Sequence, residues 1–339
     1  MTGLCIGIDF GTSNMTAYVE GKGIVVSRPS VVACDSHTGK IVAYGEEAFA
    51  MTGRTPASIE VIRPFCDGVV SDISVTTQML GDFIDNVCRM SVLKPNIIVG
   101  VPSNITSLER KAILDVLDMA GVGRVCVMEH PYAAAVGAEV AFFKPNGTML
   151  IDIGGGTVDI AVVTMGSIAA SKTIRAASES FTNDIIKYLR RERDIEIGYL
   201  TADNIKRTIG GAVIRNEEIA LVAKGRNIVT AAPINFEITS TEVYWAIKEH
   251  VDGVLSGVKE ILSSISPELS ADIFENGIVL TGKGSLLYGM DVYLESATGL
   301  PVRIAKDPAL CVAKGLGKSM HNISKLRKNG YEFKYREEL

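Results

Sequence analysis

The sequence predicts an α/β fold in which one strand-and-turn unit occurs twice. Apolar stretches of strand length alternate along the chain with stretches of helical periodicity, the pattern of layered α/β proteins. Residues 6–14 and 150–159 also echo each other: in both, an apolar strand delivers an aspartate, then a glycine turn with a hydroxyl residue, then another apolar strand. Their spacing is that of domains rather than of solenoid repeats, so we expect two related halves with a cleft between them.

The segments around these turns have the composition of strands. Residues 4–10 form a short apolar run typical of a buried strand, and residues 15–19 and 23–26 fit the next two strands. A similar strand followed by glycines, residues 278–285, lies in the last third of the chain.

Two helices have defined starts. Thr106 with Glu109, and Thr239 with Glu242, have the spacing of a capping box. Apolar residues follow each box at helical spacing, which predicts that one face of each helix packs in a core. The second helix is the longest that we expect, and Pro267 ends its apolar run because proline breaks a helix interior.

Composition excludes several classes of protein. The 339 residues carry a formal net charge of −5, which argues against nucleic-acid binding, because that requires clustered Lys and Arg. The six cysteines form no C-x-x-C pair and the histidines no ligand spacing, so we expect buried thiols in a reducing cytosol. Asp9 interrupts the first apolar stretch, which argues against a signal peptide, and no stretch is long enough to span a membrane. These features predict a cytoplasmic protein.

The two Asp-x-Gly turns have the chemistry of a magnesium-phosphate site. Glycine lets the backbone approach a phosphate closely, and successive N–H groups can form an anion-binding nest. The hydroxyl groups of Thr12, Ser13 and Thr157 can add hydrogen bonds. Asp9 and Asp152 would repel bare phosphate, so they imply a cation; Mg²⁺ takes one or two carboxylates and keeps its waters.

Alternative interpretations of the glycines fit less well. A single Asp-x-Gly turn is most often an ordinary tight turn, but two turns at equivalent positions favour a shared site. The chain has no G-x-x-x-x-G-K-[ST] phosphate loop, and residues 154–156 do not fit G-x-G-x-x-G. Lys283 lacks the upstream glycine of a Walker motif.

These motifs resemble a known superfamily. The paired turns look like the two phosphate motifs of the actin and DnaK-type chaperone ATPases, and residues 280–287 look like their adenosine motif. More specifically, several segments resemble the MreB family of bacterial cell-shape proteins, in order and without large gaps up to about Lys318. These segments are residues 28–33, 45–48, 53–56, 62–64, 67–69, 99–103 and 307–308.

The resemblance implies an actin-like ATPase fold, with duplicated ribonuclease H-like domains in four subdomains around a nucleotide cleft. Domain I would comprise residues 1–142 and 311–335, with subdomain IB at about 33–69. Domain II would comprise residues 143–310, with subdomain IIB at about 181–240.

The resemblance also implies a binding site for ATP or ADP with Mg²⁺, which Asp9 and Asp152 would hold through water. Carried over by position, the nucleotide-binding residues fall in two phosphate loops, an adenosine motif and a helix that closes over the base. They are Asp9, Gly11, Thr12, Ser13 and Asn14; Asp152, Gly154, Gly155, Gly156 and Thr157; Gly282, Lys283, Gly284 and Ser285; and Lys206.

The chain departs from the family pattern where water would be positioned for hydrolysis. His130 stands where the family has an acid, and Val158 replaces a hydroxyl residue; Asp159 completes the expected catalytic set. Ala177-Ser178 and Lys283 replace further glycines. Losing a positioned acid–base group costs about 10²–10⁴ in rate, so we expect ATP binding with slow hydrolysis. In the rival interpretation His130 positions the water itself, since imidazole accepts a proton near neutral pH.

The expected partner is the protein itself. The resemblance implies head-to-tail protofilaments that pair and attach to the inner face of the cell membrane, and the altered site favours mixed filaments with hydrolysing paralogues. Val92-Leu93 and the basic tail from Lys318 onward are candidate lipid contacts, although a packed turn and a solvated end are the simpler interpretations.

Other functions on the same fold remain open. An actin-like filament for motility or plasmid segregation is the nearest alternative. A chaperone ATPase would need a substrate domain after residue 318, and a sugar kinase would need a general-base aspartate outside the phosphate turns, for which the sequence offers no obvious candidate.

Overall fold

Two five-stranded sheets share one topology in the computed structural model, which describes residues 4–88, 93–141, 143–320, 326, 328, 330, 331, 333 and 334. The first sheet has the order β10-β9-β1-β2-β3 and the second β18-β17-β11-β12-β13. In both, the first strand of the unit pairs antiparallel with the next strand and parallel with a later one. The predicted duplication of one α/β unit is therefore confirmed.

The ten strands of these sheets are short and mostly buried. The first sheet comprises β1 (Cys5–Phe10), β2 (Asn14–Val19), β3 (Gly23–Pro29), β9 (Asn96–Val101) and β10 (Arg124–Glu129). The second comprises β11 (Thr148–Ile153), β12 (Val158–Thr164), β13 (Ser167–Ile174), β17 (Ile278–Thr281) and β18 (Val302–Ile304).

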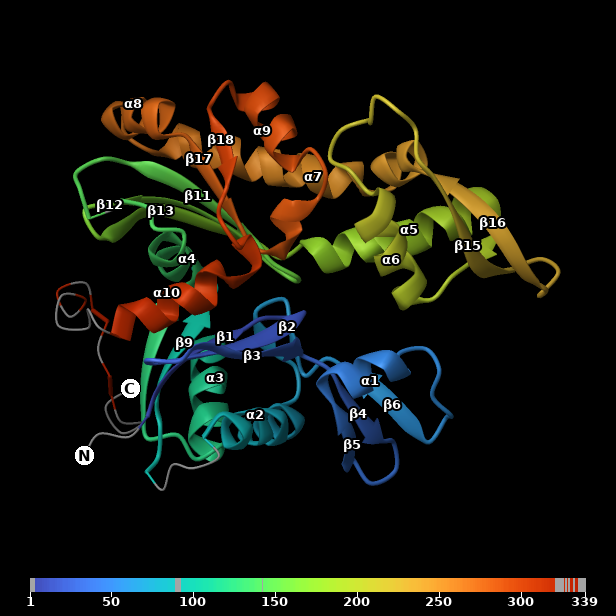
Figure 1. Cartoon of the computed structure of the whole chain (residues 1–339), viewed down its shortest axis with the longest axis horizontal. Helices are drawn as coiled ribbons and strands as arrows, with labels where there is room; N and C mark the ends of the chain where they lie inside the picture. Colours follow the sequence, from blue (N-terminus) through green and yellow to red (C-terminus); the bar gives the residue numbers. More distant parts are fainter. Residues whose placement is uncertain are drawn as a thin grey trace.

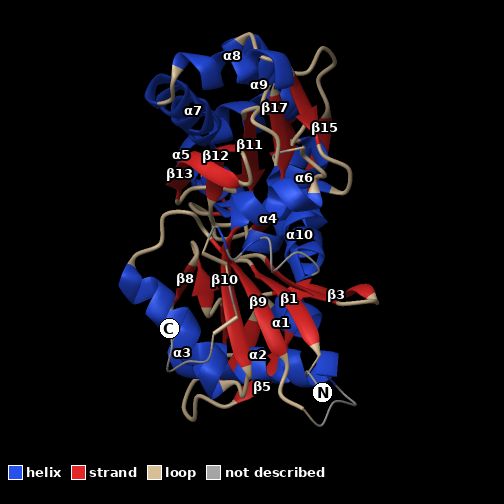
Figure 2. Cartoon of the chain, turned by 90° about the vertical axis from the view of Figure 1, so that its left-hand side faces the viewer, coloured by secondary structure: helices blue, strands red, loops and turns tan. Residues whose placement is uncertain are grey.

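Two helices, α4 (His130–Gly137) and α10 (Cys311–Ser319), lie back to back between the sheets (Figures 1 and 2). Glycine permits this contact. A Cβ atom on Gly137 would lie 1.9 Å from the Cys311 carbonyl oxygen, and one on Gly315 would lie 1.7 Å from that of Ala133. No other residue type fits either position without moving the helices apart.

The outer faces of the two sheets carry further helices (Figure 1). On the first sheet these are α2 (Ile73–Cys88) and α3 (Ser107–Met119). On the second they are α7 (Ser240–Ser264), α8 (Pro267–Asn276) and α9 (Met290–Thr298). Short 3₁₀ turns lie at Lys283–Leu286 and Pro308–Leu310. None of the described helices combines the length and apolar character needed to cross a bilayer.

Both predicted capping boxes are present. Glu109 N–H donates to Thr106 Oγ1 and Thr106 N–H to Glu109 Oε2, at 3.2 and 2.8 Å. The same exchange between Thr239 and Glu242 opens α7, the longest helix. Pro267, which ends the apolar run of α7, is the first residue of α8.

Two small units extend from the same end of the molecule, on the right in Figure 1. One is a sheet of order β5-β4-β6 with helix α1; the other is a sheet of order β14-β15-β16 with helices α5 and α6. The first unit comprises β4 (Val32–Asp35), β5 (Ile41–Tyr44), α1 (Gly45–Met51) and β6 (Ile59–Ile62). The hairpin of β7 (Phe65–Cys66) and β8 (Val69–Val70) follows this unit and packs on the core of the first large sheet, where Phe65 stacks on Phe10. The second comprises α5 (Ser178–Arg193), β14 (Ile195–Glu196), α6 (Tyr199–Ile209), β15 (Ala220–Asn227) and β16 (Pro233–Thr239). The domain and subdomain boundaries drawn from the sequence stay predictions.

Candidate functional site

The two Asp-x-Gly turns face each other across a cavity of about 740 Å³. Strand register puts the aspartates in equivalent places: Asp9 lies opposite Thr16 in the β1–β2 hairpin, and Asp152 lies opposite Asp159 in the β11–β12 hairpin. Each turn is closed by an equivalent backbone bond, from Gly11 N–H to the Asn14 carbonyl and from Gly154 N–H to the Thr157 carbonyl.

The turns not only face each other but are in contact. A Cβ atom on Gly155 would lie 2.1 Å from Ser13 Oγ, and one on Gly156 would lie 2.5 Å from Thr12 Oγ1. Glycine is therefore required at both positions by the opposite loop, and any side chain there would force the halves apart.

A buried histidine lies beneath the turns. His130 is the first residue of α4 and is 6% exposed. Its Nε2 lies 3.8 Å from Asp9 Oδ1, and its Nδ1 lies 3.5 Å from Asp159 Oδ2. Asp159 is itself fixed by hydrogen bonds from Ser103 N–H (3.1 Å) and Thr173 Oγ1 (2.5 Å).

The carboxylates decide the protonation state of His130. Burial alone would lower the pKa of the imidazole, but its hydrogen bond to Asp159 and the charge of Asp9 outweigh burial and raise that pKa to about 9. Burial raises the pKa of Asp152 to about 7, opposed by His130, and also raises the pKa of Asp9. The carboxylates around His130 thus favour its protonated form, in which the ring donates a proton rather than accepting one.

The donor set fits a hard divalent cation. Asp9 and Asp152 line the cavity with carboxylate oxygens, and Thr281 Oγ1 holds Asp152 Oδ1 at 2.7 Å. Ligand atoms of His130, Asp152 and Asp159 all lie within 4.8 Å of one another. Oxygen ligands suit Mg²⁺. A protonated His130 would neutralise part of this negative charge and so compete with a cation for the same carboxylates.

The segment after β17 packs against the second turn. Gly282 has a φ of +78°, and a Cβ atom there would lie 2.3 Å from the Ile153 carbonyl oxygen. Gly282, Lys283 and Gly284 line the cavity. Ser285 does not, because its buried hydroxyl donates to the Gly282 carbonyl at 2.7 Å.

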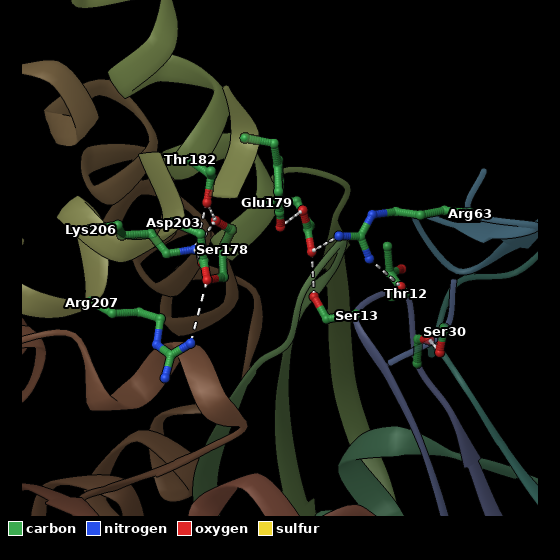
Figure 3. A network of polar contacts seen from close by, with 12 residues as sticks. Thr12, Ser13, Ser30, Arg63, Ser178, Glu179, Thr182, Asp203, Lys206 and Arg207 are labelled. Carbon is green, nitrogen blue, oxygen red and sulfur yellow. Dashed lines mark hydrogen bonds and ion pairs between the residues drawn. The ribbon is translucent and has the colours of Figure 1, made fainter. Parts of the chain in front are cut away.

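Lys206 of α6 also lines the cavity, but its ammonium is held by the protein (Figure 3). Nζ donates to the Ser178 carbonyl (2.9 Å), to Ser178 Oγ (3.0 Å) and to Thr182 Oγ1 (2.6 Å), and lies 3.0 Å from Asp203 Oδ1. These bonds from α5 residues, together with the ion pair to Asp203, fix the position of the Lys206 ammonium.

The structure thus brings most of the predicted site residues to one cavity. Val158 and Asp159 are fully buried in β12 and do not reach the cavity surface. The residues that do line it, among those predicted, are Asp9, Gly11, Thr12, Ser13, Asn14, His130, Asp152, Gly154, Gly155, Gly156, Thr157, Lys206, Gly282, Lys283 and Gly284.

Sequence reasoning missed further polar and aromatic residues in the cavity wall, five of which form two groups. In one group Arg215 stacks on Tyr288, with the guanidinium carbon 3.8 Å from the ring centroid. In the other, Arg63, Glu179 and Tyr199 contact one another. Arg63 lies in a segment that resembles the family, but nothing in the spacing identifies its contacts.

Nearly the whole chain is similar to known bacterial proteins. The family model described as MreB/Mbl protein matches residues 4–328. The cell shape-determining protein Mbl of Bacillus cereus is 44% identical over 95% of this chain and 97% of its own length. The cell shape-determining protein MreB of Escherichia coli is 40% identical over 94% of this chain and 93% of its own length.

Solved structures agree in fold. MreB5 of Spiroplasma citri bound to ADP superposes with a TM-score of 0.92 at 35% identity, covering 97% of this chain and 99% of that one. The same protein bound to AMPPNP gives 0.89 at 34% identity, with the same coverage. The fold is therefore the actin-like fold expected from the sequence, and the chain belongs to the MreB/Mbl family.

Proposed function

We propose that this protein binds ATP with Mg²⁺, polymerises into filaments on the inner face of the cell membrane and determines cell shape. The observation that carries nucleotide binding is the contact of the two glycine turns, which come from equivalent hairpins across one cavity. The similar protein MreB5 binds ADP and AMPPNP in solved structures. The cell-shape role is supported by the names of Mbl and MreB, which match nearly the whole chain.

Each element of the site has a part in this proposal. The backbone N–H groups of the two turns cradle the phosphates, and Asp9 and Asp152 hold Mg²⁺ through its waters. When bound there, Mg²⁺ would supply positive charge that neutralises the phosphates. The segment of Gly282 and Gly284 borders the adenosine, and the stem of Lys206 faces the base.

Hydrolysis is slow in this proposal because neither residue at the water-positioning places can do that work. The carboxylates of Asp9 and Asp159 raise the pKa of His130 and so favour a ring that donates a proton rather than accepting one. Val158 has no polar atom in its side chain and is sealed in the core.

Phosphate release from the purified protein tests this part of the proposal. At saturating Mg²⁺ we expect slow release from the unmodified chain and release about 10²-fold or more faster from the double variant His130→Glu/Val158→Thr. Rapid release from the unmodified chain, unaltered in the double variant, contradicts slow hydrolysis. That outcome would not test ATP binding. Nucleotide binding is therefore measured separately, by titration with a fluorescent ATP analogue.

Polymerisation is tested by sedimentation and electron microscopy with ATP, where filaments pellet and are visible. The proposed division of the chain is into domain I (1–142 and 311–335) and domain II (143–310). The proposed filaments also include hydrolysing paralogues of this protein.

The proposed contact with the membrane includes Leu93, whose side chain is 47% exposed. Val92 and most of the basic tail lie outside the described residues. Liposome pelleting with and without residues beyond Lys318 tests the tail.

A further inference from the structure

Four side chains from four elements meet at one wall of the cavity, and we call them the cleft clasp: Ser13, Arg63, Glu179 and Tyr199. Glu179, the second residue of α5, is its centre. Ser13 Oγ donates to Glu179 Oε1 at 2.5 Å, and Arg63 Nη2 lies 3.6 Å from the same oxygen (Figure 3). The Tyr199 hydroxyl donates to the other oxygen, Glu179 Oε2. Both oxygens of one carboxylate are thus engaged.

The clasp joins the two sides of the cavity. Ser13 belongs to the first glycine turn and Arg63 follows β6, whereas Glu179 and Tyr199 belong to α5 and α6. Arg63 also lies over the Tyr199 ring, 5.1 Å from its centroid, and donates to the Thr12 carbonyl at 3.4 Å.

An aromatic contact supports the same bridge. Phe49 of α1 meets the Tyr199 ring edge-on, with centroids 6.4 Å apart. The two small units that flank the cavity therefore contact each other through apolar as well as charged groups.

The clasp is shielded enough to be strong. The side chain of Glu179 is 15% exposed and that of Arg63 is 22% exposed. Hydrogen bonds to a charged group in such a place are stronger than those of an exposed ion pair. The two halves cannot separate at this wall without breaking these bonds.

The clasp also engages the first glycine turn directly. A serine hydroxyl has one proton to donate, and that of Ser13 is given to Glu179 rather than to the cavity. Glu179 therefore fixes the position of the first turn relative to the second, and the position of the turn depends on α5.

We propose that Glu179 is a positioning residue that holds the cleft closed over a bound nucleotide and limits the rate at which the nucleotide leaves. This inference rests on the proposed nucleotide binding. The carboxylate acts through Ser13, Arg63 and Tyr199, and the nucleotide leaves when these contacts open.

The release rate of a fluorescent ADP analogue, N-methylanthraniloyl-ADP, displaced by excess ADP, tests the clasp. Tyr199→Phe removes one hydroxyl and keeps the ring packed on Phe49, so the fold is preserved. We expect release about tenfold faster than from the unmodified chain. Glu179→Gln, which keeps two hydrogen-bonding atoms, should accelerate release less than Glu179→Ala.

A matched control and a double variant sharpen the test. Arg226→Ala removes an exposed ion pair with Glu196 in the neighbouring small sheet, away from the cavity, and should leave release unchanged. Arg63→Ala combined with Tyr199→Phe should give less than the product of the two single effects, because both act on Glu179.

Three outcomes would overturn the clasp: release from Tyr199→Phe within twofold of the unmodified chain, equal acceleration by Arg226→Ala, or full additivity in the double variant. Absence of analogue binding to the unmodified chain would instead refute the proposed function. A nucleotide-free readout separates the two. Amide hydrogen exchange in residues 12–14 should be faster in Tyr199→Phe than in Arg226→Ala, and equal exchange counts against the clasp.

Discussion

Replacing His130 with glutamine should weaken the protein most at low pH. The imidazolium lies among Asp9, Asp152 and Asp159, and its pKa rises from 6.5 to about 9 on folding. One pKa unit corresponds to about 1.36 kcal/mol, so the charged form contributes about 3 kcal/mol of stability. In the variant, Asp152 takes up a proton more readily because the imidazolium is absent. This protonation offsets part of the loss, so the value is an upper bound.

The direction of the pH dependence follows from the folded-state pKa being the higher one. The contribution is fully present below pH 6.5 and is lost as pH rises through 9. The loss of unfolding free energy in His130→Gln should therefore be up to about 3 kcal/mol larger at pH 6 than at pH 9.5. Urea unfolding without nucleotide, followed by circular dichroism at both pH values, measures it.

His250 provides a matched control. Its Nε2 lies 3.2 Å from a single carboxylate, that of Asp184, and its side chain is 28% exposed. His250→Gln should change stability by about 1 kcal/mol or less at either pH. An equal loss in His130→Gln at pH 6 and pH 9.5, or a larger one at pH 9.5, would show that the buried imidazole is not held as a cation.

Three further substitutions follow from the packing. Gly155→Ala should weaken ATP binding about tenfold or more, since the new methyl group would meet Ser13 Oγ. Gly198→Ala is the control and should leave binding unchanged, because no atom lies within 4 Å of the added methyl group. Titration with a fluorescent ATP analogue compares the two variants. Lys206→Met should lower the free energy of unfolding in urea by about 2 kcal/mol, because the oxygen partners of the ammonium are left unpaired. Lys187, which is exposed, is the control, and a similar loss in Lys187→Met would contradict this reasoning. Gly315→Ala should lower the free energy of unfolding by about 3 kcal/mol, because the new methyl group would meet the backbone of α4. Gly81→Ala, in open space on α2, should raise it slightly. A change of the same sign in both variants refutes the close-packing argument.

The fold could be predicted because its signals are local. A strand that ends in an aspartate and a glycine turn is visible twice in the sequence, and each capping box lies within four residues. The equivalent hydrogen-bond register of Asp9 and Asp152 follows from that repetition. The spacing alone was therefore sufficient to expect the two turns on either side of a cleft.

The contacts across the cleft could not be predicted in this way. Glu179 meets Ser13 over 166 positions of sequence, and no periodicity relates α5 to the first turn. The raised pKa of His130 could not be predicted from the sequence either, because it depends on Asp159, which lies on β12, far from α4 in the sequence. The sequence indicated that His130 replaces an acid, and only the arrangement of the three carboxylates shows why its pKa is raised.

The position of His130 also determines how the hydrolysis experiment has to be designed. His130 begins α4, which follows β10 of the first sheet and packs between the sheets, and its ring contacts Asp9 from β1 and Asp159 from β12. Glutamate at this position would replace the only cation of the cluster, among the described residues, by a fourth carboxylate. Like charges in a buried site raise one another's pKa values, so the variant would be protonated and inactive unless a divalent cation binds tightly. Phosphate release from His130→Glu/Val158→Thr should therefore depend more steeply on Mg²⁺ concentration than release from the unmodified chain, and equal dependence would mean that the imidazolium does not share the charge-neutralising role of the metal.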